Sequence, residues 1–300
     1  MEWFQNLIIV MIISYFFSSV SLSHIIWKRN PALLSGEEYI GNQLIAQEVS
    51  AKGFPAIIDE YVYIYSEHVE KTFNIIPRSS ELIYGIGVDL GGGVGCISST
   101  LANRDSVDKI YCVEIVEDVV KLCQPIVKRE ILKEKYDKVI SVTGDFDNLQ
   151  LGDNSVDFAV SWDSMHHSTD PIKTLKECKR VLKRNGILII VDRAHNNSTP
   201  DSEIERMLNI RYDEDFLIKN HRPKGMILTR RENGEHEHRF FEWKRFFHEA
   251  GFDLLESVII KTASDENKRL KNDDNIKEVF VDYNLGAFGN RKVAFVLRSN

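Results

Sequence analysis

The stretch VDLGGGVG, residues 88–95, decides the fold of this chain. It follows a short apolar run and precedes Cys96–Asn103, a segment long enough for a helix. Glycine has no Cβ and adopts positive φ readily, so Gly91, Gly93 and Gly95 allow a tight turn and a close approach of a ligand to the backbone. A glycine-rich turn between a strand and a helix is typical of a cofactor-binding α/β protein.

Short apolar runs alternate with helix-length segments on both sides of this turn. Strands are expected at residues 82–90, 109–115, 138–142, 156–162 and 186–192. The segments between them predict helices at Cys96–Asn103, Val116–Leu132 and Ile172–Lys183. Such alternation predicts a parallel sheet with helices on both faces. A helix at Phe240–Ala250 and two late strands, Phe252–Lys261 and Arg291–Leu297, complete the pattern.

The last of these strands has no crossover pattern before it, so we expect it to insert antiparallel. The sequence therefore predicts an α/β fold of the Rossmann-like type. Its sheet has seven strands, mostly parallel with an antiparallel last strand, and helices cover both faces. Residues 31–80 read as a helical N-terminal extension, and residues 81–300 as the α/β domain. A polar stretch at about residues 194–239 has no sustained period and is expected to be a substrate-recognition insert.

The first 30 residues form a hydrophobic N-terminal segment. From Leu7 to Trp27 there is no charged residue, and the mean hydropathy of about +2 lies in the range of a membrane span. Lys28 and Arg29 follow the segment, so the positive-inside rule places the rest of the chain in the cytoplasm. The two alternatives are a membrane anchor and a helix packed on the domain, because hydropathy alone does not separate them.

Composition narrows the classes of partner. With 43% hydrophobic and 28% charged residues, the chain has the composition of a globular protein. Its net charge of −7 provides no long-range attraction to phosphate backbones, which argues against a nucleic-acid partner. The four cysteines form no CxxC pair and no Cys/His metal spacing, and they are expected to be reduced thiols.

Acidic residues follow the first three predicted strands. Asp89 stands beside the glycines, where a carboxylate suits a ligand with an ammonium group better than a pyrophosphate. Glu114 ends the second strand and is placed to accept hydrogen bonds from ribose hydroxyls. Asp145 follows the third strand and suits an adenine amino group, while Phe146 is expected to pack on the ring. Cys96 occupies the third glycine position of a dinucleotide-binding GxGxxG motif, which argues against a dehydrogenase.

In these features the chain resembles a class I S-adenosylmethionine-dependent methyltransferase of the small-molecule group, over about residues 80–195. Asp89–Gly95 matches the first motif of the family, Glu114 its ribose acid and Gly144–Phe146 its adenine-side motif. Further matches are Asp153–Trp162, Met165–His167 and Leu175–Gly186. The resemblance implies S-adenosylmethionine as cofactor, bound by Asp89, Gly91, Gly93, Gly95, Glu114, Asp145, Phe146 and Trp162.

Methyl transfer is an in-line displacement, so the enzyme aligns the nucleophile and removes its proton. His166 and His167 follow the fourth strand and are the predicted catalytic residues, with His195 as a third candidate. The alternative is that His166 and His167 only shape the pocket and take no part in the chemistry. We expect O-methylation of a small-molecule, sugar or lipid-linked acceptor. The other classes left open are a module that binds the cofactor without chemistry and an aminopropyltransferase.

Several features limit the chemistry further. The sequence SWDS, residues 161–164, replaces the Asn/Asp-Pro-Pro-Tyr motif that serves N-methylation of adenine or glutamine. No metal site is predicted, although Asp163 and Asp192 are spaced to share an ion, and residues 235–238 (EHEH) are expected to form a solvated turn. The cations of the insert are expected either to hold an anionic substrate or to form a solvated face: Arg211, Lys219, Arg222, Lys224, Arg230 and Arg231.

Overall fold

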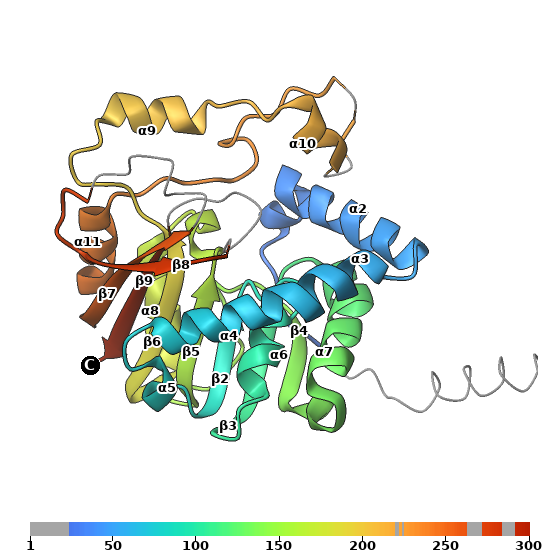
Figure 1. Ribbon diagram of the computed structural model, residues 1–300, viewed down its shortest axis with the longest axis horizontal. Helices are drawn as coiled ribbons and strands as arrows, with labels where there is room; N and C mark the ends of the chain where they lie inside the picture. Colours follow the sequence, from blue (N-terminus) through green and yellow to red (C-terminus); the bar gives the residue numbers. More distant parts are fainter. Residues whose placement is uncertain (1–23, 220–221, 224, 263–271, 284–291) are drawn as a thin grey trace, which may run out of the picture.

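A nine-stranded sheet runs through the computed structural model, which describes residues 24–219, 222–223, 225–262, 272–283 and 292–300 (Figure 1). The strands are ordered β1-β4-β3-β2-β5-β6-β9-β7-β8 across the sheet. Their bounds are β1 Ile25–Ile26, β2 Gly85–Leu90, β3 Val107–Glu114, β4 Val139–Thr143, β5 Val156–Trp162, β6 Leu182–Arg193, β7 Phe252–Thr262, β8 Lys277–Val281 and β9 Lys292–Ser299.

All seven predicted strands are present, and the last of them, β9, runs antiparallel to both β6 and β7 as predicted. The other strand pairs are parallel. The sequence missed β1 and β8, which add one strand to each edge of the sheet. Both are edge strands of two and five residues, too short to give a readable periodicity.

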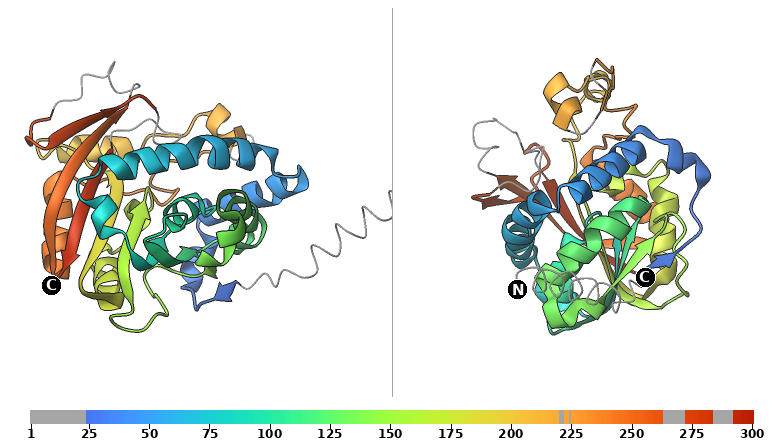
Figure 2. Two further views of the ribbon diagram at one scale, coloured as in Figure 1. Left: turned by 60° about the horizontal axis from the view of Figure 1, so that its bottom comes forward. Right: turned by 90° about the vertical axis from the view of Figure 1, so that its right-hand side faces the viewer.

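Helices cover both faces of the sheet (Figure 2). Their bounds are α2 Glu37–Ala51, α3 Pro55–Ile57, α4 Ser66–Ile75, α5 Ser79–Leu82, α6 Cys96–Ala102, α7 Gln124–Leu132, α8 Pro171–Val181, α9 Asp201–Leu208, α10 Glu214–Lys219 and α11 Phe240–Ala250. Short π-helical turns, η2 Ile58–Tyr65 and η3 Val119–Cys123, precede α4 and α7. Three 3₁₀ turns are η1 Pro31–Ser35, η4 Lys133–Lys138 and η5 Met165–His167.

Two hydrophobic cores lie between these helices and the sheet. On one face, Phe73 of α4 and Leu101 of α6 pack in the same core as Ile189 of β6. On the other face, Leu175 of α8 and Trp243 of α11 pack with the neighbouring strand residues. Alternate side chains of a strand point to opposite faces, so strands such as β3, β5, β6 and β9 contribute to both cores.

The end of the apolar N-terminal segment is an edge strand and not part of a helix. Ile25 and Ile26 pair in parallel with β4, and the amide of Trp27 donates to the carbonyl of Thr143 at 2.8 Å. Trp27 is buried in the core, so this part of the predicted span Leu7–Trp27 belongs to the domain. Residues 1–23 lie outside the described residues. Of the helices that the structure describes, none combines the length and the apolar character that a membrane span requires.

The stretch from residue 194 to 239 leaves the sheet after β6 and carries α9 and α10 (Figure 1). Its two ends are joined, because the amide of His195 donates to the carbonyl of His238 at 2.9 Å. Further along, the guanidinium of Arg222 donates to both the carbonyl and the carboxylate of Glu37 at the start of α2. The insert therefore contacts the helical extension as well as the end of β6.

Candidate active site

The glycine loop joins β2 to α6 at the carboxyl edge of the sheet. Gly91, Gly93 and Gly95 all have positive φ, at 71°, 51° and 85°. A Cβ on Gly91 would lie 2.6 Å from the Cβ of Ser164, whereas nothing lies within 4 Å of the corresponding position on Gly93. The loop is therefore tightly packed at Gly91 and leaves the backbone at Gly93 open to a ligand.

Asp89, one residue before the end of β2, is 1% exposed. Its Oδ2 accepts a hydrogen bond from the Ser98 hydroxyl at 2.6 Å, while Oδ1 is buried with no partner among the described residues. Burial raises the pKa of Asp89 to about 7 against the hydrogen bonds from Ser98. Because buried polar atoms are normally partnered, this oxygen is a position for a cationic group of a ligand.

Glu114 ends the neighbouring strand β3 and turns towards the glycine loop. Its Oε2 accepts a hydrogen bond from the amide of Gly93 at 3.1 Å, and its Oε1 accepts one from the amide of Val116 at 2.9 Å. Burial raises the pKa of Glu114, and these backbone hydrogen bonds oppose that effect. The predicted ribose acid thus also holds the loop in place.

Asp145 and Phe146 follow β4, the next strand along the sheet. The carboxylate of Asp145 accepts hydrogen bonds from the amides of Asp147 at 2.8 Å and Asn30 at 3.4 Å. The ring of Phe146 lies 3.8 Å from the Cβ position of Gly91. The structure therefore brings the predicted adenine-side residues to the same edge of the sheet as the glycine loop.

Trp162 ends β5 and makes contacts of a different kind. Its indole nitrogen donates to the hydroxyl of Tyr65 at 2.8 Å, and its ring centroid lies 5.6 Å from that of Phe73. These partners belong to η2 and α4 of the helical extension. The hydrogen-bonding group of Trp162 is therefore engaged inside the protein.

His166 lies in η5, directly after β5, and forms a buried pair with Asp192 at the end of β6. The Nδ1 of His166 is 2.7 Å from one oxygen of Asp192, and its backbone amide donates to the other at 3.0 Å. Burial lowers the pKa of His166, although the charge of Asp192 opposes this. With the proton on Nδ1 donated to Asp192, Nε2 keeps its lone pair. It lies 3.7 Å from Glu235, beyond hydrogen-bond distance.

His167 and His195, the other two predicted histidines, each contact a glutamate. The Nδ1 of His167 lies 2.8 Å from the carboxylate of Glu38 in α2. Although burial acts against the charged form, Glu38 and Glu235 raise the pKa of His167 to about 9. The Nε2 of His195 lies 2.6 Å from the carboxylate of Glu237. At neutral pH His167 is protonated, so of the two histidines of η5 His166 is the one suited to accept a proton.

The prediction of a solvated turn at residues 235–238 is wrong. Glu235 and Glu237 are 7% and 6% exposed. The guanidinium of Arg193 contacts both carboxylates, and that of Arg230 contacts Glu237. Burial opposes ionisation of Glu235, but Arg193 and His166 lower its pKa to about 2. The sequence did contain a signal for this burial, namely the alternation of acid and histidine in EHEH. Because alternate side chains of an extended chain point to opposite sides, this spacing places both acids on one side.

Three of the six cations predicted in the insert are neutralised, whereas the exposed Arg211 forms no ion pair with a described residue. Arg222, Arg230 and Arg231 form ion pairs with Glu37, Glu237 and Glu205. The side chains of Lys219 and Lys224 lie outside the described residues. Among the described cations of this stretch, these three are therefore not free to hold an anionic substrate.

Asp163 and Asp192, which the sequence allowed to share an ion, each contact a different basic side chain. The ammonium of Lys292, on β9, forms an ion pair with Asp163, while His166 bonds Asp192. Lys292 is 3% exposed, so its charge remains inside the same cluster. Asp163, His166 and Asp192 are close enough to ligate a metal together, but the carboxylates already have these partners.

A family model described as a methyltransferase domain matches residues 88–190. The match begins in β2, ends in β6 and includes the glycine loop, Glu114, Asp145 and both histidines of η5. The chain therefore carries a methyltransferase domain over residues 88–190, with the fold of the class I S-adenosylmethionine-dependent methyltransferases. S-adenosylmethionine is accordingly the cofactor of this methyltransferase.

Two curated relatives resemble this methyltransferase over part of its length. The sarcosine/dimethylglycine N-methyltransferase of Aphanothece halophytica is 29% identical over 48% of this chain and 51% of its own length. The glycine/sarcosine/dimethylglycine N-methyltransferase of Actinopolyspora halophila is 31% identical over 41% of this chain and 21% of its own length. The chain thus spans about half the length of the first relative and about a fifth of the second.

Among solved structures, a candidate sarcosine dimethylglycine methyltransferase from Galdieria sulphuraria superposes with a TM-score of 0.50. It is 18% identical, and the superposition covers 78% of this chain and 84% of that one. At this identity the likeness concerns the fold alone.

Proposed function

We propose that this methyltransferase transfers the methyl group of S-adenosylmethionine to a small-molecule acceptor and that His166 removes the proton of the attacking group. The observation that carries this proposal is the buried pair of His166 and Asp192 at the carboxyl ends of β5 and β6. In open α/β sheets ligands bind at this edge, where the glycine loop also lies.

The residues at the glycine loop fit the cofactor. The partnerless Oδ1 of Asp89 suits a cationic amino group, and the open space at Gly93 admits a ligand to the backbone. The carboxylate of Glu114 suits ribose hydroxyls, and Asp145 with Phe146 suits the adenine. When bound, the cofactor supplies an electrophilic methyl group.

The chemistry assigned to the protein is proton removal and alignment. Asp192 holds the imidazole of His166 in one tautomer, with Nδ1 as donor and Nε2 as acceptor. As the nucleophile attacks, its proton passes to Nε2, and the carboxylate of Asp192 stabilises the imidazolium that forms. The lowered pKa of His166 keeps the ring neutral at neutral pH, so the base is available before the reaction.

The acceptor that we favour is a hydroxyl group of a neutral small molecule, with sugars and lipid-linked sugars among the compounds to test. A hydroxyl needs a base to become a nucleophile, and the pair of His166 and Asp192 provides one. An amino-acid acceptor needs a cation for its carboxylate. Arg222, Arg230 and Arg231 are already paired with acids, which leaves the exposed Arg211 as the unpaired arginine among the described cations of the insert. The second candidate is N-methylation of glycine derivatives, which the names of the curated relatives favour.

The decisive experiment measures S-adenosylhomocysteine formation by the full chain with two panels of acceptors. One panel contains sugars, lipid-linked sugars and phenols, and the other contains glycine, sarcosine and dimethylglycine. Carbon-13 NMR with labelled cofactor distinguishes an O-methyl from an N-methyl product. O-methyl products support the favoured acceptor, whereas turnover of the amines alone rejects it for the second candidate. Cofactor binding with no turnover of either panel contradicts both.

Replacement of Gly93 by alanine tests where the cofactor lies. The new methyl group would extend into open space, so the expected cost in the free energy of unfolding is only about 1 kcal/mol for the positive φ. The affinity for S-adenosylmethionine is expected to fall by about tenfold or more, because the methyl group would displace the ligand from the backbone. Calorimetric titration and thermal unfolding of the same variant measure both quantities. An unchanged affinity would show that the cofactor does not bind next to Gly93.

A further inference from the structure

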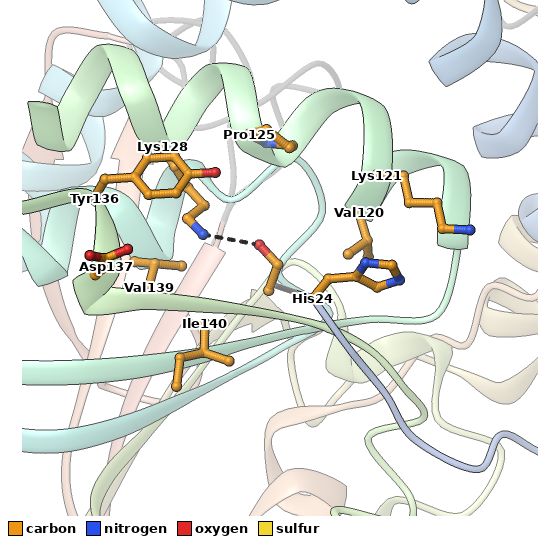
Figure 3. Close-up of a pocket in the computed structure, with 10 residues that line it drawn as sticks. His24, Val120, Lys121, Pro125, Lys128, Tyr136, Asp137, Val139 and Ile140 are labelled. Carbon is orange, nitrogen blue, oxygen red and sulfur yellow. Dashed lines mark hydrogen bonds between the residues drawn. The ribbon is translucent and has the colours of Figure 1, made fainter. Parts of the chain in front are cut away.

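A pocket of about 340 Å³ lies at the β4 edge of the sheet, between β4, α7 and the chain that leads into β1 (Figure 3). Its lining includes none of the residues that we assign to the cofactor. Val120, Pro125, Val139 and Ile140 provide apolar walls. A pocket with apolar walls and a few polar groups is the usual form of a small-molecule site.

Lys128 is the polar group at the centre of this pocket, and it is only 4% exposed. Its ammonium lies 3.3 Å from the hydroxyl of Ser141 and 4.3 Å from the ring centroid of Tyr136 (Figure 3). No carboxylate of the described residues lies within ion-pair distance of it. Burial lowers the pKa of Lys128 to about 8, although the charge of Asp137 opposes this. A buried ammonium without an acidic partner is energetically costly, so an anionic group of a ligand would stabilise it.

His24 supplies a second unsatisfied group to the same pocket (Figure 3). Its Nε2 is buried and has no hydrogen-bond partner in the part of the chain that the structure describes. Lys121 also lines the pocket and is ion-paired with Glu117, and Asp137 is the acid among the lining residues. Two nitrogen groups, neither with an acidic partner among the described residues, thus belong to the lining of the same pocket.

We propose that this pocket binds a small molecule in which one oxyanion, a carboxylate or a phosphate, is attached to an apolar body. The oxyanion accepts hydrogen bonds from Lys128 and His24, and the apolar body packs on Val120, Pro125 and Ile140. Hydrogen bonds between ionised groups are stronger than those between neutral groups, which favours an oxyanion over a neutral polar group. The site is separate from the glycine loop, and its ligand is expected to bind whether or not the cofactor is present.

Calorimetric titration of the full chain with benzoate and with phenyl phosphate tests this assignment, with benzyl alcohol as the neutral control. Either anion is expected to bind saturably in the presence of S-adenosylhomocysteine, and the alcohol is not. At pH 8 binding is expected to take up protons, because an oxyanion favours the charged form of Lys128. The other titratable groups that line the pocket are His24, Lys121, Tyr136 and Asp137. Comparison of two buffers with different ionisation enthalpies measures the proton uptake.

Lys128→Met removes the central charge and is expected to weaken binding of the anion by about tenfold or more. The variant should fold, because a buried charge without an acidic partner is replaced by an apolar group of similar length. Lys176→Met, on an exposed position of α8, is the matched control and is expected to bind like the wild type. Full affinity in Lys128→Met, or equal binding of anion and alcohol, would overturn the proposal.

A second measurement does not depend on that variant. The pKa of Lys128 is measured by carbon-13 NMR after reductive methylation of the lysines. The signal of Lys128 is identified by its absence in Lys128→Arg. Addition of benzoate or phenyl phosphate is expected to raise this pKa, while Lys176 stays unchanged. An unchanged pKa of Lys128 at saturating anion would also overturn the proposal.

Discussion

His166→Gln is expected to lower the turnover of this methyltransferase by about 10²–10⁴-fold, the contribution typical of a positioned base. Glutamine cannot accept the proton of the acceptor, but its amide keeps a donor for Asp192. The affinity for S-adenosylmethionine is expected to change little, because the contacts that we assign to the cofactor lie on β2, β3 and β4. Single-turnover rates with the acceptor found in the screen, together with calorimetry, separate the two effects.

Asp192→Asn and His167→Gln give this experiment its controls. Asp192→Asn is expected to lower turnover as well, since an asparagine no longer fixes the tautomer of His166 or stabilises its charge. His167→Gln is expected to keep most of the turnover, because His167 is already protonated at neutral pH by the influence of Glu38. Near-normal turnover in His166→Gln would reject the base and leave His166 as a structural residue.

The pH profile gives an independent check on the same base. Because the pKa of His166 lies below its usual value, kcat/KM in the wild type should fall only below the pH range in which an exposed histidine titrates. Asp192→Asn removes the opposing carboxylate and should lower the pKa of His166 further. If kcat/KM instead decreases as the pH is lowered through about 9, the titrating group is His167.

Asp89→Asn is expected to weaken S-adenosylmethionine binding by about 10–100-fold, the usual loss when one charged hydrogen-bond partner is removed. In the wild type the affinity is expected to rise between pH 6 and pH 8, because Asp89 ionises near pH 7 and the cofactor is cationic. At pH 6 the binding of S-adenosylmethionine should release a proton, because Asp89 ionises when the cationic cofactor binds. Calorimetry across this range measures both, with Asp108→Asn, at an exposed position of β3, as the matched control.

The same substitution is expected to raise stability at alkaline pH. The pKa of Asp89 is raised in the folded state, so the folded protein holds this proton more tightly than the unfolded chain does. The stabilisation of the folded state by this bound proton is complete below the ordinary aspartate pKa and is lost as the pH rises through about 7. At pH 8, Asp89→Asn should therefore increase the free energy of unfolding by up to about 4 kcal/mol. Equal stability of variant and wild type at pH 5 and pH 8 would contradict this account of the buried carboxylate.

The sequence was enough to predict the sheet and the strand ends at which the proposed cofactor residues lie. Short apolar runs separated by helical segments leave few topologies, and the carboxyl ends of parallel strands must meet at one edge. For this reason Asp89 and Glu114 are found near the ends of the neighbouring strands β2 and β3, and Asp145 directly follows β4, as predicted. The antiparallel last strand was also predictable, from the missing crossover before it.

The electrostatic state of the histidines was decided only by the tertiary structure. The partner of His166 lies 26 residues away on β6, and Lys292, the partner of Asp163, lies 129 residues away on β9. No local pattern links such pairs, since strand order and not sequence distance brings them together. Glu38 likewise comes from α2 in the extension, and it makes His167 a cation where the sequence treated both histidines alike.

Burial decided what the remaining charged residues do. Composition and spacing allowed EHEH and the cations of the insert to be solvated, because most charged residues are. The structure instead buries Glu235 and Glu237 against Arg193, and it leaves Lys128 with no carboxylate within ion-pair distance among the described residues. The sequence thus determined where the backbone turns and which strand ends meet. The fold decided which charges are withdrawn from water, because the cost of a buried charge depends on neighbours that only folding supplies.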